Sequence, residues 1–374
     1  MSEASLIIAA SEQNADLFYA TGFWAPDPFI FLQIGDKKLL LMSDLEVDRA
    51  RSESKVDEVL SISRLADDAR KRGIAKPGLV DILEIVLKER EVDALRVPST
   101  FPVGIADRIR AKGFSLRVSE DPFFPERMCK RPEEVAAIRE TIRLTEEALQ
   151  AAIRLIEESE IKGEDLWLRG QPLTSELVRK VLHLTLMGSD CLAQETIVAG
   201  GAQACDPHCI GFGPLKAHKP IVLDVFPVST KSRYYADITR TVVKGKPSET
   251  LKKMYQAVRH GQEIAFGMVK NGVQAQTIHQ AILDYFEKEG FTTGEKNGRM
   301  TGFFHGTGHG LGLEIHEPPR ISSTPDILKT GQVVTVEPGL YYPEEGGIRI
   351  EDDVFVTATG CEVLSSFPKV FELF

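Results

Sequence analysis

The chain has 374 residues, 43% of them apolar and 27% charged, which is typical of a globular protein with two or three domains. Its 45 basic and 55 acidic residues give a net charge of −10, which disfavours nucleic acid and anionic membranes as binding partners. No apolar run could span a bilayer, and residues 1–10 lack the basic start of a secretory signal, so we expect a cytoplasmic protein. Five cysteines are too few for a disulfide framework, so we expect reduced thiols.

The first part of the chain alternates strand-like and helix-like runs, which predicts an α/β domain with its own sheet. Residues 29–32 and 38–42 are apolar runs on either side of a Gly-Asp turn, and residues 78–90 have the spacing of an amphipathic helix. A proline-rich stretch, 121–125, follows. We therefore place the first domain at residues 1–126 and the second at 127–374.

The second domain contains two units with the same order of elements, which indicates an internal duplication. The first unit is predicted to comprise helices 132–158 and 172–187 and strands 221–227 and 234–243. The second is predicted to comprise helices 248–269 and 274–289 and strands 333–337 and 348–356. Each unit therefore ends in a β-hairpin.

Each predicted hairpin carries two acids in apolar strands, where a buried carboxylate is costly unless a cation pairs with it. We expect Asp224 and Asp237 to lie directly opposite one another, because both are equally far from a turn centred near residues 230–231. Glu337 and Glu351 are likewise placed evenly about a turn near residue 344. Four acids related by an internal repeat indicate one cation site shared by both halves.

A fifth donor is expected from residues 305–316, which hold three of the eight histidines, His305, His309 and His316, among four glycines. A single histidine is more often a core or loop residue, but three within twelve residues favour a site. The glycines permit close approach of neighbouring backbones, which suits a strand packed against a metal-binding sheet.

Other chemical motifs fit less well. The glycines lack the G-x-G-x-x-G spacing of a dinucleotide-binding loop, and the sequence contains no phosphate loop and no G-x-S-x-G nucleophile elbow. The pair His316-Glu317 begins like a helical zinc-protease motif but lacks the second histidine and precedes two prolines. The segment 205–209 has two cysteines and a histidine, yet no second ligand pair at zinc-finger spacing.

At these residues the sequence resembles the pita-bread metallopeptidases, and among them the aminopeptidase P and prolidase branch, which cleaves the bond before proline. The resemblance spans nearly the whole chain, and its most specific segments are 236–241, 305–317, 335–341 and 347–352. It implies an N-terminal creatinase-like α/β domain followed by a C-terminal pita-bread catalytic domain. Phe226 stands where the family usually has glycine, so we expect a reshaped wall beside the site.

The resemblance implies a dinuclear centre whose ligands are Asp224, Asp237, His309, Glu337 and Glu351. This oxygen-rich set suits Mn²⁺ best, with Co²⁺ or Zn²⁺ as alternatives. The nucleophile would be a hydroxide that bridges the two ions, because the metals lower the pKa of bound water. Glu337 would act as both ligand and proton shuttle.

The resemblance also implies catalytic roles for other histidines. His316 and His208 would stabilise the tetrahedral intermediate by hydrogen bonding, and His305 would be a nearby site residue. Arg349 and Thr239 each lie two positions from an expected ligand, on the same strand face, and are predicted to orient carboxylates.

We therefore expect a homodimeric metallopeptidase that hydrolyses Xaa-Pro bonds in dipeptides or in longer peptides. Arg320 and Lys329 are equal candidates for binding the free carboxylate of a substrate. The alternatives are a methionine aminopeptidase, which usually lacks so large an N-terminal domain, a creatinase-like amidinohydrolase and a non-catalytic peptide-binding relative. All five ligand residues are present, which argues against the last two.

Overall fold

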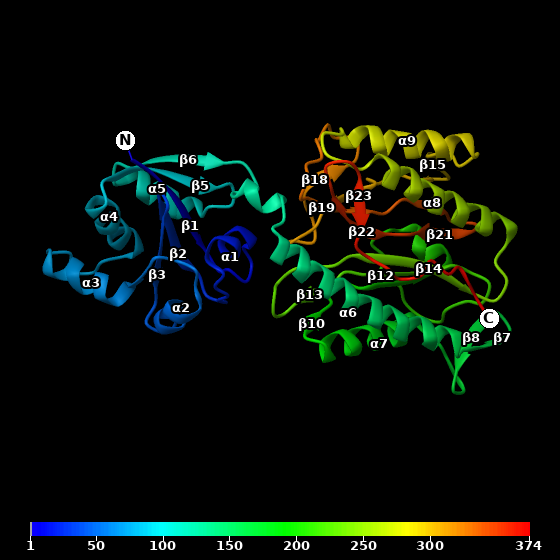
Figure 1. Ribbon diagram of the computed structural model, residues 1–374. Coiled ribbons are helices and arrows are strands. Elements are labelled where there is room, and N and C mark those ends of the chain that lie inside the picture. The colour runs from blue at the N-terminus through cyan, green and yellow to red at the C-terminus, as the bar shows by residue number, and fades with distance from the viewer. Residues whose placement is uncertain (1) are drawn as a thin grey trace. The chain divides into compact units, whose positions relative to one another are not determined.

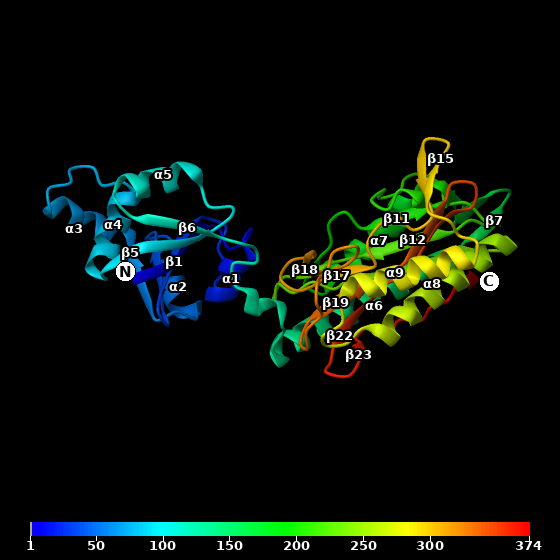
Figure 2. The same ribbon diagram turned by 90° about the horizontal axis from the view of Figure 1, so that it is seen from above.

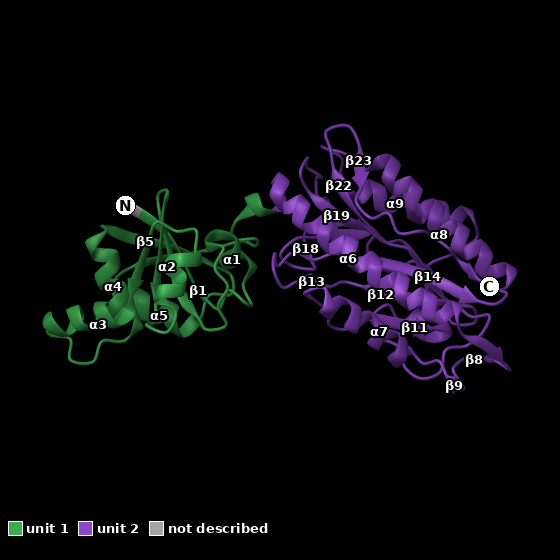
Figure 3. Cartoon of the chain, turned by 60° about the horizontal axis from the view of Figure 1, so that its bottom comes forward, with its two compact units in different colours: residues 1–127 green, residues 128–374 purple. Residues whose placement is uncertain are grey.

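The computed structural model describes residues 2–374. The chain divides into two compact units, which Figure 3 distinguishes by colour: unit 1 ends at Arg127 and unit 2 covers Met128–Phe374. Within the described residues no helix combines the length and the apolar character needed to cross a membrane.

Unit 1 is the expected α/β domain, built on one six-stranded mixed sheet with the strand order β4-β3-β2-β1-β5-β6. The strands are β1 (Ser2–Ala9), β2 (Phe29–Ile34), β3 (Lys37–Met42), β4 (Glu58–Ser61), β5 (Val92–Pro98) and β6 (Ser115–Ser119). The helices are α1 (Ala15–Thr21), α2 (Val47–Glu53), α3 (Ile62–Lys71), α4 (Leu79–Glu89) and α5 (Val103–Ala111), with a 3-10 turn at Pro125–Met128. Alternate residues of β1 pack into two separate apolar clusters, so both faces of the sheet are covered.

Unit 2 repeats one arrangement twice, in which a pair of helices packs on strands that follow it in the chain. The first pair is α6 (Pro132–Glu157) and α7 (Ser175–Gly188), and the second is α8 (Glu249–Met268) and α9 (Ala275–Lys288). Figure 1 shows the two pairs on opposite sides of the central strands, and an apolar cluster fills the space beneath each pair. The predicted duplication and the predicted fold class are thus confirmed.

The strands of unit 2 form two main sheets. One has the order β11-β12-β14-β24 and contains β11 (Ile197–Gly200), β12 (Ile221–Val225), β14 (Ile238–Lys244) and β24 (Glu372–Leu373). The other has the order β18-β17-β19-β22-β23 and contains β17 (Gly308–Gly310), β18 (Glu317–Ile321), β19 (Val333–Val336), β22 (Asp352–Val356) and β23 (Cys361–Val363). A hairpin of β20 (Gly339–Tyr342) and β21 (Gly346–Arg349) packs on the first of these sheets, because β21 contacts both β12 and β14. Two residues then connect β21 to β22 of the second sheet, and β22 also contacts β14.

Shorter elements complete unit 2 at its edges, and Figure 2 shows the pair β15 and β16 projecting as a separate hairpin. They are β7 (Glu160–Lys162), β8 (Asp165–Leu168), β9 (Gln171–Pro172), β10 (Cys191–Leu192), β13 (Val228–Ser229), β15 (Gly294–Lys296), β16 (Arg299–Thr301) and a 3-10 helix at Gly201–Cys205.

Two helices of unit 2, α7 and α8, begin after a capping hydroxyl group. Helix α8 begins after Ser248, as predicted, and the Ser248 hydroxyl accepts a backbone N–H of the first turn at 3.1 Å. The prediction that the second helix begins at residue 172 is wrong, because Gln171–Pro172 form β9 and α7 begins after Thr174. The Thr174 hydroxyl accepts the N–H of Leu177, so this cap, and not the proline, sets the helix start.

The register predicted for the first acidic hairpin is also wrong. Asp224 pairs with Thr239, and Asp237 lies two positions before that partner, outside the start of β14. The Ser229 hydroxyl accepts two backbone N–H groups within the turn, which places the turn centre one residue later than predicted. Asp224 and Asp237 are therefore diagonal neighbours on one face and not a directly opposed pair.

The second acidic hairpin has the predicted register. Val336 pairs with Asp352 and Gly339 pairs with Arg349, so the strands are symmetric about residue 344. The single strand predicted for residues 348–356 is, however, divided into β21 and β22 by two residues that leave the ladder, and one of these is an acid.

The glycines of β17 allow three backbone segments to approach one another closely. A Cβ atom on Gly308 would lie 1.9 Å from the carbonyl oxygen of Thr335, and one on Gly310 would lie 2.4 Å from that of Pro318. Real side chains cannot occupy such positions, so β17 requires glycine on both sides of its histidine.

We expect Gly308→Ala to destabilise unit 2 by about 1–3 kcal/mol, because the added methyl group forces backbone shifts in a packed sheet. The control is Gly267→Ala in α8, where a Cβ meets nothing within 4 Å and the free energy of unfolding should be unchanged or raised by up to about 1 kcal/mol. Urea denaturation in a Trp24→Phe background would report on unit 2 through Trp167, the other of the two tryptophans. Equal stability of the two glycine variants would contradict the close approach at β17.

Candidate metal centre

Five predicted donors meet where the two halves of unit 2 come together. Each lies in or beside a central strand: Asp224 in β12, Asp237 just before β14, His309 in β17, Glu337 just after β19 and Glu351 just before β22. The halves are joined at this point by a hydrogen bond from the N–H of Glu351 to the carbonyl of Thr239, 3.0 Å long. Both repeats therefore contribute to one site.

The donor atoms are close enough to share cations. His309 Nε2 lies 3.6 Å from Asp237 Oδ2 and 3.5 Å from Glu337 Oε1. One ligand atom each from Asp237, His309 and Glu351 all lie within 4.8 Å of one another. The charge of Asp224 also acts on Asp237, Glu337 and Glu351, since it raises the pKa of each.

The cluster has unused electron pairs that a divalent cation would satisfy. One carboxylate oxygen each on Asp224, Asp237 and Glu351 is buried without a hydrogen-bond partner among the described residues. Buried polar atoms are normally paired, and three orphaned anionic oxygens in one place need a positive charge. Carboxylate oxygens with one imidazole are ligands that divalent metals accept, so these residues fit a metal centre.

Electrostatics supports this interpretation. Burial, followed by the charges of neighbouring acids, raises the pKa of Asp237 and of Glu351 well above the ordinary value. Burial raises the pKa of Glu337 to about 7, although the Arg349 guanidinium opposes this rise. Ionising all four acids at one site is therefore energetically unfavourable unless a cation lies among them.

His309 is arranged as a neutral ligand. Burial and the charge of His316 lower its pKa to about 3. Its Nδ1 lies 3.1 Å from the carbonyl oxygen of Gly310, which can only accept, so Nδ1 carries the proton. The lone pair of Nε2 is thereby left facing Asp237 and Glu337, as metal ligation requires.

Arg349 and Thr239 each hold a carboxylate from the other half of unit 2, and not that of the acid two positions away in the sequence. Arg349 Nη2 donates to Asp224 Oδ2 at 2.6 Å. Thr239 Oγ1 donates to Glu351 Oε2 at 2.7 Å, across the junction of the two halves and not to Asp237 on its own strand. Each contact leaves the other oxygen of that carboxylate without a hydrogen-bond partner in the described chain, and thus free for a cation.

Two further contacts were not expected from sequence. Asp353 is fully buried, and its Oδ2 accepts the backbone N–H of Asp237 at 3.0 Å. Tyr341 is also fully buried, and its hydroxyl accepts from Arg349 Nη1 at 2.9 Å. The sequence could have indicated a role for Asp353, because it is the third consecutive acid in an apolar strand and a buried acid requires a partner. No comparable pattern pointed to Tyr341.

The other predicted histidines differ in their surroundings. His316 is exposed, and its ring centre lies 4.3 Å from that of His309 in an edge-to-face arrangement. His208 is exposed as well, and its charge acts on both His305 and His316. The structure therefore brings His316 and His208 to the solvent-facing side of the cluster.

His305 has both ring nitrogens engaged by the protein. Nδ1 lies 2.8 Å from the carbonyl oxygen of Gly306, and Nε2 lies 2.8 Å from the Tyr341 hydroxyl. Burial lowers the pKa of His305 to about 3, so the ring is neutral. With Nδ1 protonated, Nε2 accepts from Tyr341, and the described contacts leave neither nitrogen for a ligand.

The two basic residues considered for binding a substrate carboxylate, Arg320 and Lys329, differ in position. The charge of Arg320 lowers the pKa of Glu337 and of His309, which places Arg320 beside the cluster. Lys329 is exposed, and none of the contacts described for it reaches the five donors. Of the two, Arg320 alone is positioned to meet a ligand of the site.

Comparison with known proteins agrees with this geometry. Residues 136–358 match the model of metallopeptidase family M24, and residues 1–112 match the creatinase/prolidase N-terminal domain. The chain is 29% identical to a Xaa-Pro dipeptidase of Pyrococcus furiosus over 88% of its own length and 85% of that protein. An X-Pro aminopeptidase structure from Thermotoga maritima superposes with a TM-score of 0.82 at 25% identity, covering 99% of this chain and 97% of the other. This protein therefore belongs to metallopeptidase family M24 and is a metallopeptidase with the pita-bread fold.

Proposed function

We propose that this protein hydrolyses the peptide bond that precedes proline, as a Xaa-Pro dipeptidase or an aminopeptidase of the same specificity. The observation that carries the proposal is the meeting of five donor side chains around three orphaned, buried carboxylate oxygens. The names of the relatives from Pyrococcus furiosus and Thermotoga maritima supply the substrate class. The presence of all five donor residues favours this activity over that of a creatinase-like amidinohydrolase or a non-catalytic binding protein.

The centre would hold two divalent ions, with Mn²⁺ as the metal that suits the donors best. Four carboxylates balance the charge of two such ions, and oxygen-rich sets favour Mn²⁺ over the sulfur and nitrogen sites of structural zinc. The ligands would be Asp224, Asp237, His309, Glu337 and Glu351. When bound, the ions would polarise the scissile carbonyl and lower the pKa of a water molecule so that it can attack at neutral pH.

Glu337 is the acid that can best exchange a proton with the substrate. Its side chain is 19% exposed, compared with 11% for Asp224 and 6% for Asp237. A carboxylate at the solvent-facing edge of the cluster can accept the proton of the attacking water and deliver it to the departing nitrogen. The more deeply buried acids would serve only as ligands.

His316 and His208 would bind the substrate from the exposed side of the cluster. Both can donate hydrogen bonds to the carbonyl oxygen as negative charge develops on it. His305 would instead hold the Tyr341 hydroxyl, which accepts from Arg349, and so would act as a positioning residue. Phe226, next to β12, would form part of the wall that the family usually leaves open with glycine.

His309 and His316 should differ in what their removal abolishes. His309→Ala should weaken Mn²⁺ binding more than about 100-fold, because a ligand is lost. His316→Ala should keep its metal and lose about 10²–10³ in kcat, because a donor to the developing oxyanion is removed. Elemental analysis and steady-state kinetics measure both quantities, and equal metal loss in the two variants would rule out this division of roles.

Ala-Pro should be cleaved about 100-fold more efficiently than Ala-Ala in the presence of Mn²⁺. Proline provides a tertiary amide without an N–H, so recognition must rely on the shape of the ring and the free N-terminus. The loss for Ala-Ala should appear in kcat as well as in KM, because contacts to the transition state are lost. Ala-Pro-Ala as a third substrate would separate dipeptidase from aminopeptidase activity, and equal turnover of Ala-Pro and Ala-Ala would refute the proline specificity.

A further inference from the structure

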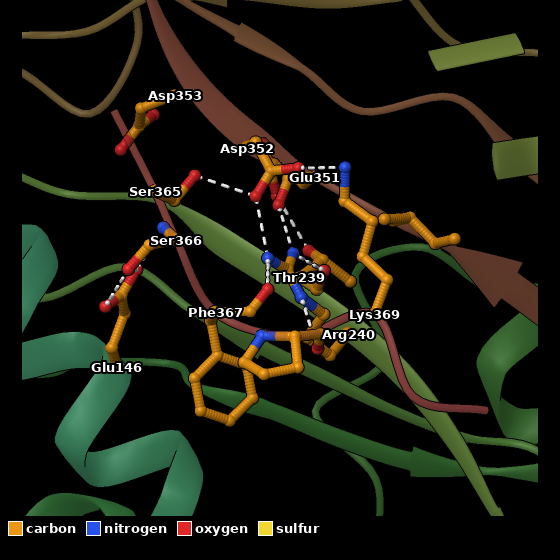
Figure 4. Close-up of polar contacts among 12 residues, drawn as sticks. Glu146, Thr239, Arg240, Glu351, Asp352, Asp353, Ser365, Ser366, Phe367 and Lys369 are labelled. Atoms are coloured by element: carbon orange, nitrogen blue, oxygen red, sulfur yellow. Dashed lines mark hydrogen bonds and ion pairs between the residues drawn. The ribbon is translucent and has the colours of Figure 1, made fainter. Parts of the chain in front are cut away.

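The last part of the chain returns to the strand that carries one of the proposed ligands. Residues 364–369 run past the start of β22, and Figure 4 shows their polar contacts with Asp352. Ser365 Oγ donates to Asp352 Oδ1 at 2.7 Å, and Lys369 Nζ forms an ion pair with Asp352 Oδ2 at 2.8 Å. Asp352 is 1% exposed, so both contacts are made inside the protein.

Arg240 joins this segment to the metal-ligand strands. Its guanidinium is buried, with the residue only 1% exposed, and it cannot lose its proton. Nη2 donates to Asp352 Oδ1 and to the carbonyl oxygen of Phe367, both at 2.7 Å, and Nε donates to the carbonyl of Pro368 at 3.3 Å. A buried cation requires such complete pairing, so the position of Arg240 depends on the C-terminal segment.

The remaining donors of Arg240 hold the backbone at Glu351. Nη1 donates to the carbonyl oxygen of Glu351 at 2.6 Å and to that of Thr239 at 2.9 Å. Glu351 lies where the strand leaves the ladder between β21 and β22, so no regular strand pairing fixes its carbonyl. At this residue Arg240 therefore provides the hydrogen bond to the backbone carbonyl that a neighbouring strand would otherwise supply. The Thr239 hydroxyl holds the carboxylate of the same residue.

We propose that the segment 365–369 positions Glu351 for metal binding, through Asp352 and Arg240, although it supplies no ligand itself. The inference rests on the proposed function, because it assumes that Glu351 is a metal ligand. Arg240 and Asp352 act as positioning residues. The metal affinity of the centre therefore depends on a segment that follows its last ligand in the chain.

Two adjacent serines allow a matched test. Ser365 bonds Asp352, whereas the hydroxyl of its neighbour Ser366 donates to Glu146 of α6 at 3.0 Å, away from the ligand strand. Ser365→Ala should weaken Mn²⁺ binding about tenfold, which is typical of residues that orient a ligand. Ser366→Ala should change the affinity less than twofold, and Ser365→Thr, which keeps the hydroxyl, should restore it. Titration calorimetry of the metal-free full chain measures these affinities without reference to activity.

A second pair of variants separates positioning from general stability. Arg240→Lys removes the fork that holds Glu351, whereas Lys244→Met removes a buried cation at the other end of β14, whose Nζ donates to the carbonyl of Glu157 at 2.7 Å. Arg240→Lys should weaken Mn²⁺ binding about 10–100-fold and speed amide hydrogen exchange at Glu351. Lys244→Met should lower thermal stability and leave the affinity within twofold of the wild type.

The outcomes distinguish this inference from the proposed function. If the wild-type chain binds Mn²⁺ and cleaves Ala-Pro, while Ser365→Ala and Arg240→Lys bind Mn²⁺ as tightly as it does, the inference is overturned and the proposed function stands. If the wild-type chain binds no divalent ion, both are overturned. Affinity lost in the Ser365 and Arg240 variants but kept in the Ser366 and Lys244 variants supports the inference.

Discussion

The arrangement of unit 2 depends on burying four acidic side chains beside one another. Burial and mutual repulsion raise the pKa of Asp237, Glu337 and Glu351, and three carboxylate oxygens of the cluster have no partner in the described chain. Without a cation, such a cluster destabilises the folded state whenever the acids ionise. The chain belongs to a metallopeptidase family, and a bound metal would offset this destabilisation.

The surrounding structure fixes the acids before any metal arrives. The duplication brings two hairpins together, so that each half supplies two carboxylates to a common centre. Arg349 and Thr239 each hold one oxygen of a carboxylate that is proposed as a ligand, while glycines in β17 let the histidine strand approach the acids. With the carboxylates already held in place, the free-energy cost of bringing the acids together is met during folding. Little rearrangement is then needed when a metal binds.

Local patterns in the sequence predicted most of this arrangement. Apolar periodicity, a capping serine and terminating glycines predicted the four helices of unit 2, and the symmetry of acids about residue 344 predicted the register of the second hairpin. The first register was missed because the Ser229 hydroxyl shifts the turn, an effect of side-chain bonding that hydrophobic pattern does not encode. The partners of Asp353 and Arg240 were missed because they lie more than 100 residues away in the sequence and depend on tertiary packing.

Stability as a function of pH, with and without Mn²⁺, tests the central claim most directly. Below about pH 4 the acids are protonated in both the folded and the unfolded states. Between that pH and about 7, where the pKa of Glu337 lies, they ionise freely only when unfolded, so the metal-free protein should lose stability as pH rises. Mn²⁺ should reverse this loss at pH 8, as measured by the unfolding midpoint of Trp167 fluorescence in the Trp24→Phe background. A metal-free protein that is more stable at pH 8 than at pH 5, or a midpoint that Mn²⁺ does not raise, would contradict the account.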